Sequence, residues 1–263
     1  PVSSTGHMIL VNEFIKLSVS DNFWKLFEVV IQLGAILAVV VIYWNKIWPF
    51  QLSTEKQGVM DEGIFAHIKK AQFVLWIKIM IACVPAAVIG ILFDELFEKW
   101  FYNPISIALA LIVFGVAFIV VERWNKTKKP TVTKLSQLGL KEIIIIGLFQ
   151  VLAAIFPGTS RSGATIVGAL LIGVSRQVAA DFTFFLAIPV MFGASLLKVI
   201  KLGLAFSALE FAYLGLGCLV AFIVSVITIK FLLSYIKKND FTVFGIYRII
   251  LGIIVIVFFK FIA

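Results

Sequence analysis

Apolar stretches of about twenty residues recur along the chain and are separated by short polar segments. Stretches of about that length can cross a bilayer as helices. They predict full membrane spans at about 23–44, 72–93, 104–122, 178–198, 209–236 and 241–262. Asp21 and Asn22 are expected to cap the first span. Residues 8–19 are expected to form a helix that is too short and too polar to cross.

A different pattern occupies residues 142–175. About fifteen apolar residues lead to Pro157, a polar run with Gly158 and Gly163 follows, and the apolar segment 168–174 resumes for half a span. Two half-length helices joined by a polar break are typical of a re-entrant hairpin. Such a break is tolerated at membrane depth only where protein or a water-filled cavity surrounds it. We therefore expect this segment to enter the membrane and return to the same side.

Composition supports the membrane assignment. Of the 263 residues, 62% are hydrophobic and 14% are charged, whereas soluble domains have about 45–50% apolar and about 25% charged residues. The fold class predicted is an all-α polytopic membrane protein with about six transmembrane helices, forming a single integral membrane domain over residues 1–263.

The formal net charge of +9 indicates orientation rather than nucleic-acid binding, because cytoplasmic loops of membrane proteins are rich in Lys and Arg. The polar loop 45–71, the basic loop 123–141 and the pair Lys237–Lys238 fall on one side if 142–175 does not cross. The acidic link 94–103 and the loop 199–208 then fall on the other side. The distribution of charge thus independently favours the hairpin.

The opening residues PVSSTGHMI resemble the later run PGTSRSGATI: each has a proline, small hydroxyl residues, a glycine and then an apolar half-helix. The spans that follow also align, 27–37 with 182–194. The first repeat is predicted at about 1–122 and the second at about 140–263, in opposite orientations. In such inverted repeats, the broken elements meet near the bilayer midplane and form a polar site.

Arg161 is the strongest candidate for a binding residue. An arginine inside a membrane costs at least about 2.5–3.5 kcal/mol on insertion scales. Such a residue therefore has either a function or a structural role, such as snorkelling to an interface or forming a buried ion pair. Ser160, Ser162, Gly163 and Thr165 surround it, and a helix is expected to begin just after it. Guanidinium donors, hydroxyls and the free N–H groups of a helix start together favour a phosphate site.

His7 is the second candidate because it follows Ser3, Ser4 and Thr5 in the partner loop of the repeat. Histidine suits proton transfer or nucleophilic attack near neutral pH. A histidine that faces an arginine-hydroxyl site predicts phosphoryl transfer, in which one loop supplies the base or nucleophile and the other stabilises charge on the phosphate.

Other polar residues in the spans carry weaker expectations. Glu28 and Gln32 lie one turn apart and either line the cavity or join helices. Asp181 is expected to favour the start of its helix. Arg248 is expected to snorkel to the inner surface.

The runs PVSSTGH, FEVVIQLGAILAVVV, PGTSRSGATI, GVSR and FLAIPVMFGA closely resemble the bacterial undecaprenyl-diphosphate phosphatases of the bacitracin-resistance type. The likeness extends nearly end to end, to the final IYR segment. It implies a multi-pass enzyme of the bacterial plasma membrane with two re-entrant hairpins and a site that faces the outer side. Such an enzyme removes the terminal phosphate of undecaprenyl diphosphate, leaves the monophosphate that carries cell-wall precursors, and confers bacitracin resistance.

Carried onto this chain, the resemblance implies that Arg161 binds the diphosphate with help from Ser160 and Thr165. His7 is then the catalytic histidine, with the Ser4 hydroxyl beside it; whether the serine or the histidine attacks phosphorus stays open. The remaining residues of the two loops are expected to contribute to the diphosphate site: Ser3, Thr5, Ser162 and Gly163.

The resemblance also implies a divalent cation, Mg²⁺ or Ca²⁺. In the family, a glutamate-rich half-helix of the pattern E-x-x-x-E-F-L precedes the proline that is Pro1 here, so the expected metal ligands lie upstream of Pro1. The expected partners are a polyprenyl diphosphate and membrane lipids, with no nucleic acid; a homo-oligomer is left open. The alternative function is a transporter or flippase for polyprenyl phosphate or another anion, since broken helices at the midplane are also typical of transporters.

Overall fold

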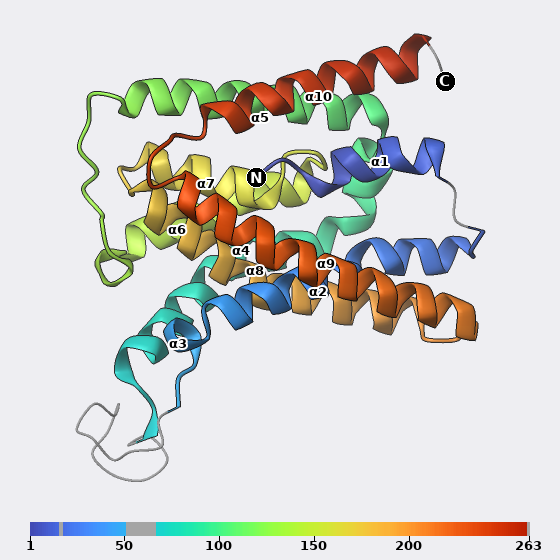
Figure 1. The fold of residues 1–263 in the computed structure, drawn as a ribbon, viewed down its shortest axis with the longest axis horizontal. Coiled ribbons are helices and arrows are strands. Elements are labelled where there is room, and N and C mark those ends of the chain that lie inside the picture. Colours follow the sequence, from blue (N-terminus) through green and yellow to red (C-terminus); the bar gives the residue numbers. More distant parts are fainter. Residues whose placement is uncertain (16–17, 51–66, 262–263) are drawn as a thin grey trace. The chain divides into compact units, whose positions relative to one another are not determined.

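The computed structural model describes residues 1–15, 18–50 and 67–261 (Figure 1). Within these ranges the elements are α1 (Ser4–Phe14), α2 (Asp21–Ile42), α3 (Trp44–Ile47), α4 (Lys70–Phe101), α5 (Pro104–Asn125), the 3-10 helix η2 (Leu135–Gln137), α6 (Leu140–Ile155), α7 (Arg161–Leu171), α8 (Arg176–Leu202), α9 (Ala208–Tyr235) and α10 (Thr242–Phe261). The prediction of an all-helical chain is confirmed. Residues 51–66 of the predicted loop 45–71 lie outside the described ranges.

Among the described residues, 6 helices are long and apolar enough to cross a membrane: α2, the Lys70–Phe93 part of α4, α5, α8, α9 and α10. They coincide with the predicted spans to within a few residues at most ends. Many of their large apolar side chains are exposed, as expected where lipid rather than protein covers a helix. The chain is therefore a multi-pass membrane protein.

Several helix ends differ from the prediction. The first helix begins at Ser4 rather than at Met8, because Ser3 caps it with its side chain. The cap of α2 is Ser20, whose Oγ accepts from Phe23 N at 3.3 Å, so the prediction of Asp21 and Asn22 as caps was wrong. Several capping residues stood in a row at that point, and composition alone did not decide between them.

The acidic link predicted at 94–103 is also wrong for most of its length, because α4 continues through it to Phe101. Glu and Lys are good helix formers, so their charge did not end the helix. The break comes at Asn103, whose Oδ1 caps α5 by accepting from Ser106 N at 2.9 Å, followed by Pro104 at the first helical position.

Helices α6 and α7 form a hairpin of two short arms. They have 16 and 11 residues, and neither is among the helices long enough to span. They pack so closely that a Cβ on Gly168 would lie 2.5 Å from the Phe149 ring. The two ends of the hairpin are joined: Thr131 N donates to Gly173 O at 2.8 Å, and Ser175 N donates to Val132 O at 2.8 Å. The loop segment at Thr131 and Val132, before α6, therefore lies beside the residues that follow α7.

The chain divides into two compact units, each built from both halves of the sequence. The first contains Pro1–Ser18, Ala82–Thr183 and Leu233–Ala263; the second contains Val19–Ile81 and Phe184–Leu232. In the first unit, α5 and α10 lie side by side (Figure 1). Gly115 and Gly245 allow this approach, since a Cβ on either would lie 2.7 or 2.6 Å from the other's carbonyl oxygen.

An ion pair closes one end of the first unit. Arg176 at the start of α8 binds Glu122 near the end of α5, with Nη2 2.5 Å from Oε2. Glu122 is buried and also accepts from Phe241 N at 3.0 Å. One carboxylate therefore joins α5, α8 and the residue before α10. In the second unit, α2 and α9 are in close contact at Gly34, where a Cβ would clash with the carbonyl of Cys218.

Candidate functional site

The two serine-rich loops enter their helices in the same conformation. Ser3 and Ser160 are the N-caps of α1 and α7, with φ/ψ of 69/106 and 65/115, and in the described part of the chain no other non-glycine residue has a positive φ. Each Oγ accepts from the amide three residues on, Gly6 N at 3.4 Å and Gly163 N at 3.2 Å. Both helices have 11 residues. A strained conformation of this kind costs of order 1–3 kcal/mol and is held here by the same cap at two separate places.

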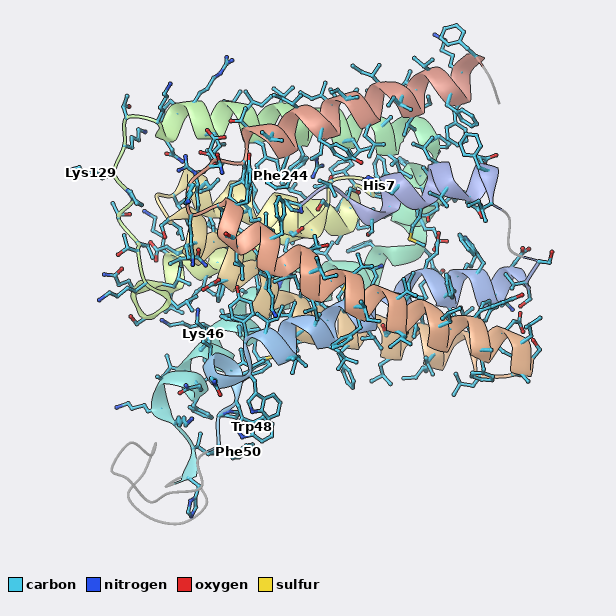
Figure 2. All side chains as sticks on the ribbon, in the orientation of Figure 1. His7, Lys46, Trp48, Phe50, Lys129 and Phe244 are labelled. Atoms are coloured by element: carbon cyan, nitrogen blue, oxygen red, sulfur yellow. The ribbon has the colours of Figure 1, made fainter. Side chains whose placement is uncertain are left out.

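In the first loop, both ring nitrogens of His7 have partners. Nδ1 lies 2.7 Å from the carbonyl oxygen of Ser3, and Nε2 lies 2.6 Å from Oη of Tyr247. A carbonyl oxygen only accepts, so Nδ1 carries the hydrogen in the neutral ring and Nε2 accepts from the phenol. The rings of His7 and Tyr247 also stack, with centroids 5.6 Å apart and planes at 10°. Figure 2 shows His7 near the start of α1, where Ser4 is exposed and Thr5 is half-buried.

In the second loop, Arg161 is the first residue of α7, as the sequence predicted to within one position. Its Nη1 is buried and has no hydrogen-bond partner among the residues that the structure describes. Ser160 Oγ lies 3.2 Å from Ser162 Oγ, so two hydroxyls and a guanidinium occupy the first turn. The amides of a first turn have no partner within their own helix and attract anions.

Thr165 has a different environment. It is fully buried, and its Oγ1 lies 3.0 Å from the carbonyl oxygen of Arg161 and 2.9 Å from Oγ1 of Thr183. A carbonyl oxygen only accepts, so the Thr165 hydroxyl donates within its own helix and accepts from the Thr183 hydroxyl on α8. Thr165 joins α7 to α8 in this structure, and its predicted role in binding diphosphate stays a prediction.

Arg248 is the residue that the sequence interpretation misplaced. Instead of reaching an interface, its side chain is completely buried. Nη2 donates to the carbonyl oxygens of Thr159 at 2.6 Å and Gly158 at 3.1 Å; Nη1 donates to Pro1 O at 3.3 Å and Nε to Leu111 O at 3.5 Å. One guanidinium thus binds the backbone of both serine-rich loops.

The position of this guanidinium also depends on a glycine in α7. A Cβ on Gly163 would lie 2.6 Å from Nη1 of Arg248. The Ser-x-x-Gly spacing of the second loop therefore has two physical reasons: the glycine amide receives the cap from Ser160, and its missing side chain leaves room for the arginine beneath.

Helix α10 brings the two loops together. Tyr247 contacts His7, and the adjacent Arg248 contacts the loop that precedes Arg161, so all four residues belong to one compact unit. Sequence reasoning did not single out Tyr247. The available signal was two adjacent polar side chains inside an otherwise apolar span.

Glu28 and Gln32 belong to the second unit, whereas the two serine-rich loops belong to the first. Gln32 Nε2 donates to the carbonyl oxygen of Glu28 at 2.8 Å, and their role as cavity lining stays a prediction. Asp181 is not at a helix start, because α8 begins at Arg176. It is buried and accepts from Gln177 Nε2 at 3.0 Å, so that interpretation was wrong.

The residues present do not fit the divalent cation that the resemblance implies. Within the described ranges, no group of three or more His, Cys, Asp and Glu side chains could hold a metal ion. Near the loops, the prominent charged groups are the two guanidiniums, which repel a cation.

Fold and site define a class of protein: a polytopic helical membrane protein with two serine-capped helix starts. The loops before both helices bind one buried arginine. The sequence profile described as "Bacitracin resistance protein BacA" matches residues 1–254, and the chain belongs to this family. A relative from Desulfitobacterium hafniense, named undecaprenyl-diphosphatase, is 58% identical over 260 residues, covering 99% of this chain and 90% of the relative. Relatives with the same name from Acetivibrio thermocellus and Enterococcus faecalis are 57% and 56% identical, covering 98% and 97% of this chain and 91% and 90% of the relatives.

Proposed function

We propose that this protein is an undecaprenyl-diphosphatase, which hydrolyses the terminal phosphate of undecaprenyl diphosphate and leaves the monophosphate. Membership of the BacA family and the shared name of relatives at 51–58% identity support this function. The observation that carries the site is Arg161, whose buried Nη1 finds no partner among the described residues. The same names do not favour the transporter alternative.

In the membrane, α6 and α7 form a re-entrant hairpin, and α1 is the second arm of its counterpart in an inverted repeat. The matching caps at Ser3 and Ser160 support the repeat. The joined ends of the hairpin at Thr131 and Gly173 support entry and exit on one side. The site faces the outer side of the bacterial plasma membrane, opposite the basic loops.

The diphosphate binds at the start of α7. The fork of Arg161 donates to phosphate oxygens, and the hydroxyls of Ser160 and Ser162 add further donors. The dipole of the helix and the first-turn amides other than the capped Gly163 N favour the same negative charge. Thr165 acts indirectly by holding α7 against α8 through Thr183. Ser3 and Thr5 belong to the wall that α1 contributes, and the prenyl chain extends into lipid.

His7 acts from the other loop. Ser4 and His7 are three residues apart, so they share one face of α1. In the serine route, Ser4 Oγ forms a bond to the terminal phosphorus, its proton moves to His7 Nε2, and the bridging P–O bond breaks. Undecaprenyl monophosphate then leaves, and water hydrolyses the phosphoserine to inorganic phosphate. In the alternative route, Nε2 itself attacks. The bond from Nδ1 to the Ser3 carbonyl oxygen makes Nε2 the basic nitrogen in both routes. The Tyr247 hydroxyl occupies the lone pair of Nε2 in this structure and must move aside before Nε2 reacts.

Hydrolysis by the full-length protein in detergent tests the proposal. Inorganic phosphate released from undecaprenyl diphosphate is measured for wild type, Arg161→Ala, His7→Ala and the control Arg123→Ala, an exposed residue near the end of α5. We expect both site variants to lose about 10²–10⁴-fold in kcat/KM and the control to keep the wild-type value. Normal turnover by the two site variants would refute the assigned roles, and absence of phosphate release by wild type would refute the function.

A further inference from the structure

We propose that Gln150 is a further substrate-binding residue, whose Nε2 donates from α6 to the phosphate that Arg161 binds from α7. The inference concerns a residue outside both serine-rich loops, on the first arm of the α6–α7 hairpin. It rests on the proposed function for the identity of the ligand, a lipid phosphate.

The first support is the state of the Gln150 side chain. It is 2% exposed, and neither Nε2 nor Oε1 has a hydrogen-bond partner among the described residues. A buried amide in this state lowers stability, because both of its polar groups have lost water and gained no partner. An apolar side chain of similar size would fill the same space without this cost. Retention of the amide therefore favours a role in binding over a role in packing.

The second support is the direction of the side chain. Helix α6 contacts α4 at Gly147, where a Cβ would lie 2.6 Å from the carbonyl oxygen of Ala82. Gln150 is three residues further on and shares that face of α6. The adjacent residue of α4 is Cys83, whose buried thiol interacts with both the Gln150 amide and the Arg161 guanidinium. Amide and guanidinium therefore lie on opposite sides of one thiol, within the first unit.

The third support is the chemistry of the two groups. Nη1 of Arg161 is also buried and without a partner among the described residues. Both nitrogens only donate, so a single acceptor between them satisfies both, and the arginine charge favours an anion. Oε1 of Gln150 does not accept from Nη1, so the amide is not used to hold the guanidinium. Arg161 and the hydroxyl residues on either side of it are half-buried, which leaves the first turn of α7 as the side from which a phosphate enters.

The kinetic test compares wild type, Gln150→Met and the matched control Gln177→Met. Methionine keeps the unbranched shape and removes both polar atoms. Loss of one hydrogen bond to a charged phosphate should lower kcat/KM by about tenfold to a hundredfold, whereas the unfolding midpoint should stay at or above the wild-type value. Gln177 belongs to the same unit, and its Nε2 donates to Asp181 Oδ1 at 3.0 Å. The control should therefore show the reverse: a midpoint at or below wild type and kcat/KM within about twofold of it.

The two readouts together separate binding from folding. A lower midpoint for Gln150→Met would assign the residue to the fold, and an unchanged kcat/KM would exclude contact with the substrate. Either result would overturn the proposal. Gln150→Glu adds a test of sign, because a carboxylate accepts from Arg161 and repels a phosphate. Its kcat/KM should fall below that of Gln150→Met, and an equal or higher value would also overturn the proposal.

A binding test is independent of hydrolysis. Undecaprenyl monophosphate, added in excess to the full-length protein in detergent, should raise the unfolding midpoint of wild type. The rise should be smaller for Gln150→Met and should keep its wild-type size for Gln177→Met. Equal rises for the two variants would overturn the proposed contact. Failure of the proposed function has a different signature: wild type would release no phosphate from the diphosphate, while the monophosphate still stabilised wild type more than Gln150→Met.

Discussion

Replacing Arg248 by methionine should weaken the fold and inactivate the site together. The change keeps most of the side-chain volume but removes every donor that the guanidinium supplies to Pro1, Leu111, Gly158 and Thr159. The carbonyls of Gly158 and Thr159 are the decisive ones, because they have the shorter bonds and belong to buried residues.

The expected magnitude follows from those two bonds. A buried carbonyl left without a donor costs about 1–3 kcal/mol, so two cost about 2–6 kcal/mol. Removal of a charge that was buried offsets part of this, and we expect the free energy of unfolding to fall by about 2–4 kcal/mol. With about 2–4 °C per kcal/mol for chains of comparable size, the unfolding midpoint should fall by about 5–15 °C. If the loop at Gly158 and Thr159 shifts by about 1 Å, the rate of hydrolysis should fall by about a hundredfold.

Thermal unfolding of the variants in the same detergent measures the loss of stability. Phosphate release, assayed at a temperature below the unfolding midpoint, measures the loss of activity. Arg248→Lys keeps the charge and some donors, so its values should lie between wild type and Arg248→Met. Arg123→Met, at an exposed position, serves as the control. If Arg248→Met unfolds at the wild-type midpoint and hydrolyses at the wild-type rate, the guanidinium does not hold the loops and the reasoning is wrong.

Two further predictions concern packing and topology. Gly163→Ala should lower the unfolding midpoint and kcat/KM, because its Cβ would lie 2.6 Å from the buried guanidinium of Arg248. The control Gly193→Ala, with nothing within 4 Å of the new Cβ, should leave both quantities unchanged. Equal effects of the two substitutions would contradict this prediction. Lys128→Cys and Lys237→Cys should both be protected from a membrane-impermeant thiol reagent added outside cells. Labelling of the second alone would mean that α6 and α7 cross the membrane.

Local signals were sufficient for much of the architecture. Asn103 and Pro104 begin α5 where a cap and a first-turn proline predict it. The half-length arms around Pro157 were recognisable because an apolar segment of about fifteen residues is too short to cross. Arg161 at a helix start could also be predicted, since hydroxyls, glycine and arginine follow one another within six residues. Each of these features depends on neighbours in the chain.

Features that depend on distant partners were not predictable in the same way. Tyr247 and His7 are 240 residues apart, and Arg248 binds carbonyls 89 and 247 residues away. Whether an arginine near a helix end snorkels or is buried depends on which backbone groups lie beside it, and the sequence does not specify these. The choice of Ser20 over Asp21 as a cap is a smaller example, because adjacent residues competed with similar preferences.

Two arginines of the first unit, Arg161 and Arg248, have different roles in the proposed site. Arg248 is completely buried and donates to four carbonyl oxygens of the protein. In half-buried Arg161, the buried Nη1 has no partner among the described residues. A satisfied guanidinium stabilises the loops in the absence of ligand and gives little further energy when a ligand arrives. An unsatisfied one, held by that fixed frame, gives its hydrogen-bond energy to the anion that binds. In the proposed function, this fixed frame is the condition under which Arg161 discriminates between a phosphate and an uncharged lipid headgroup.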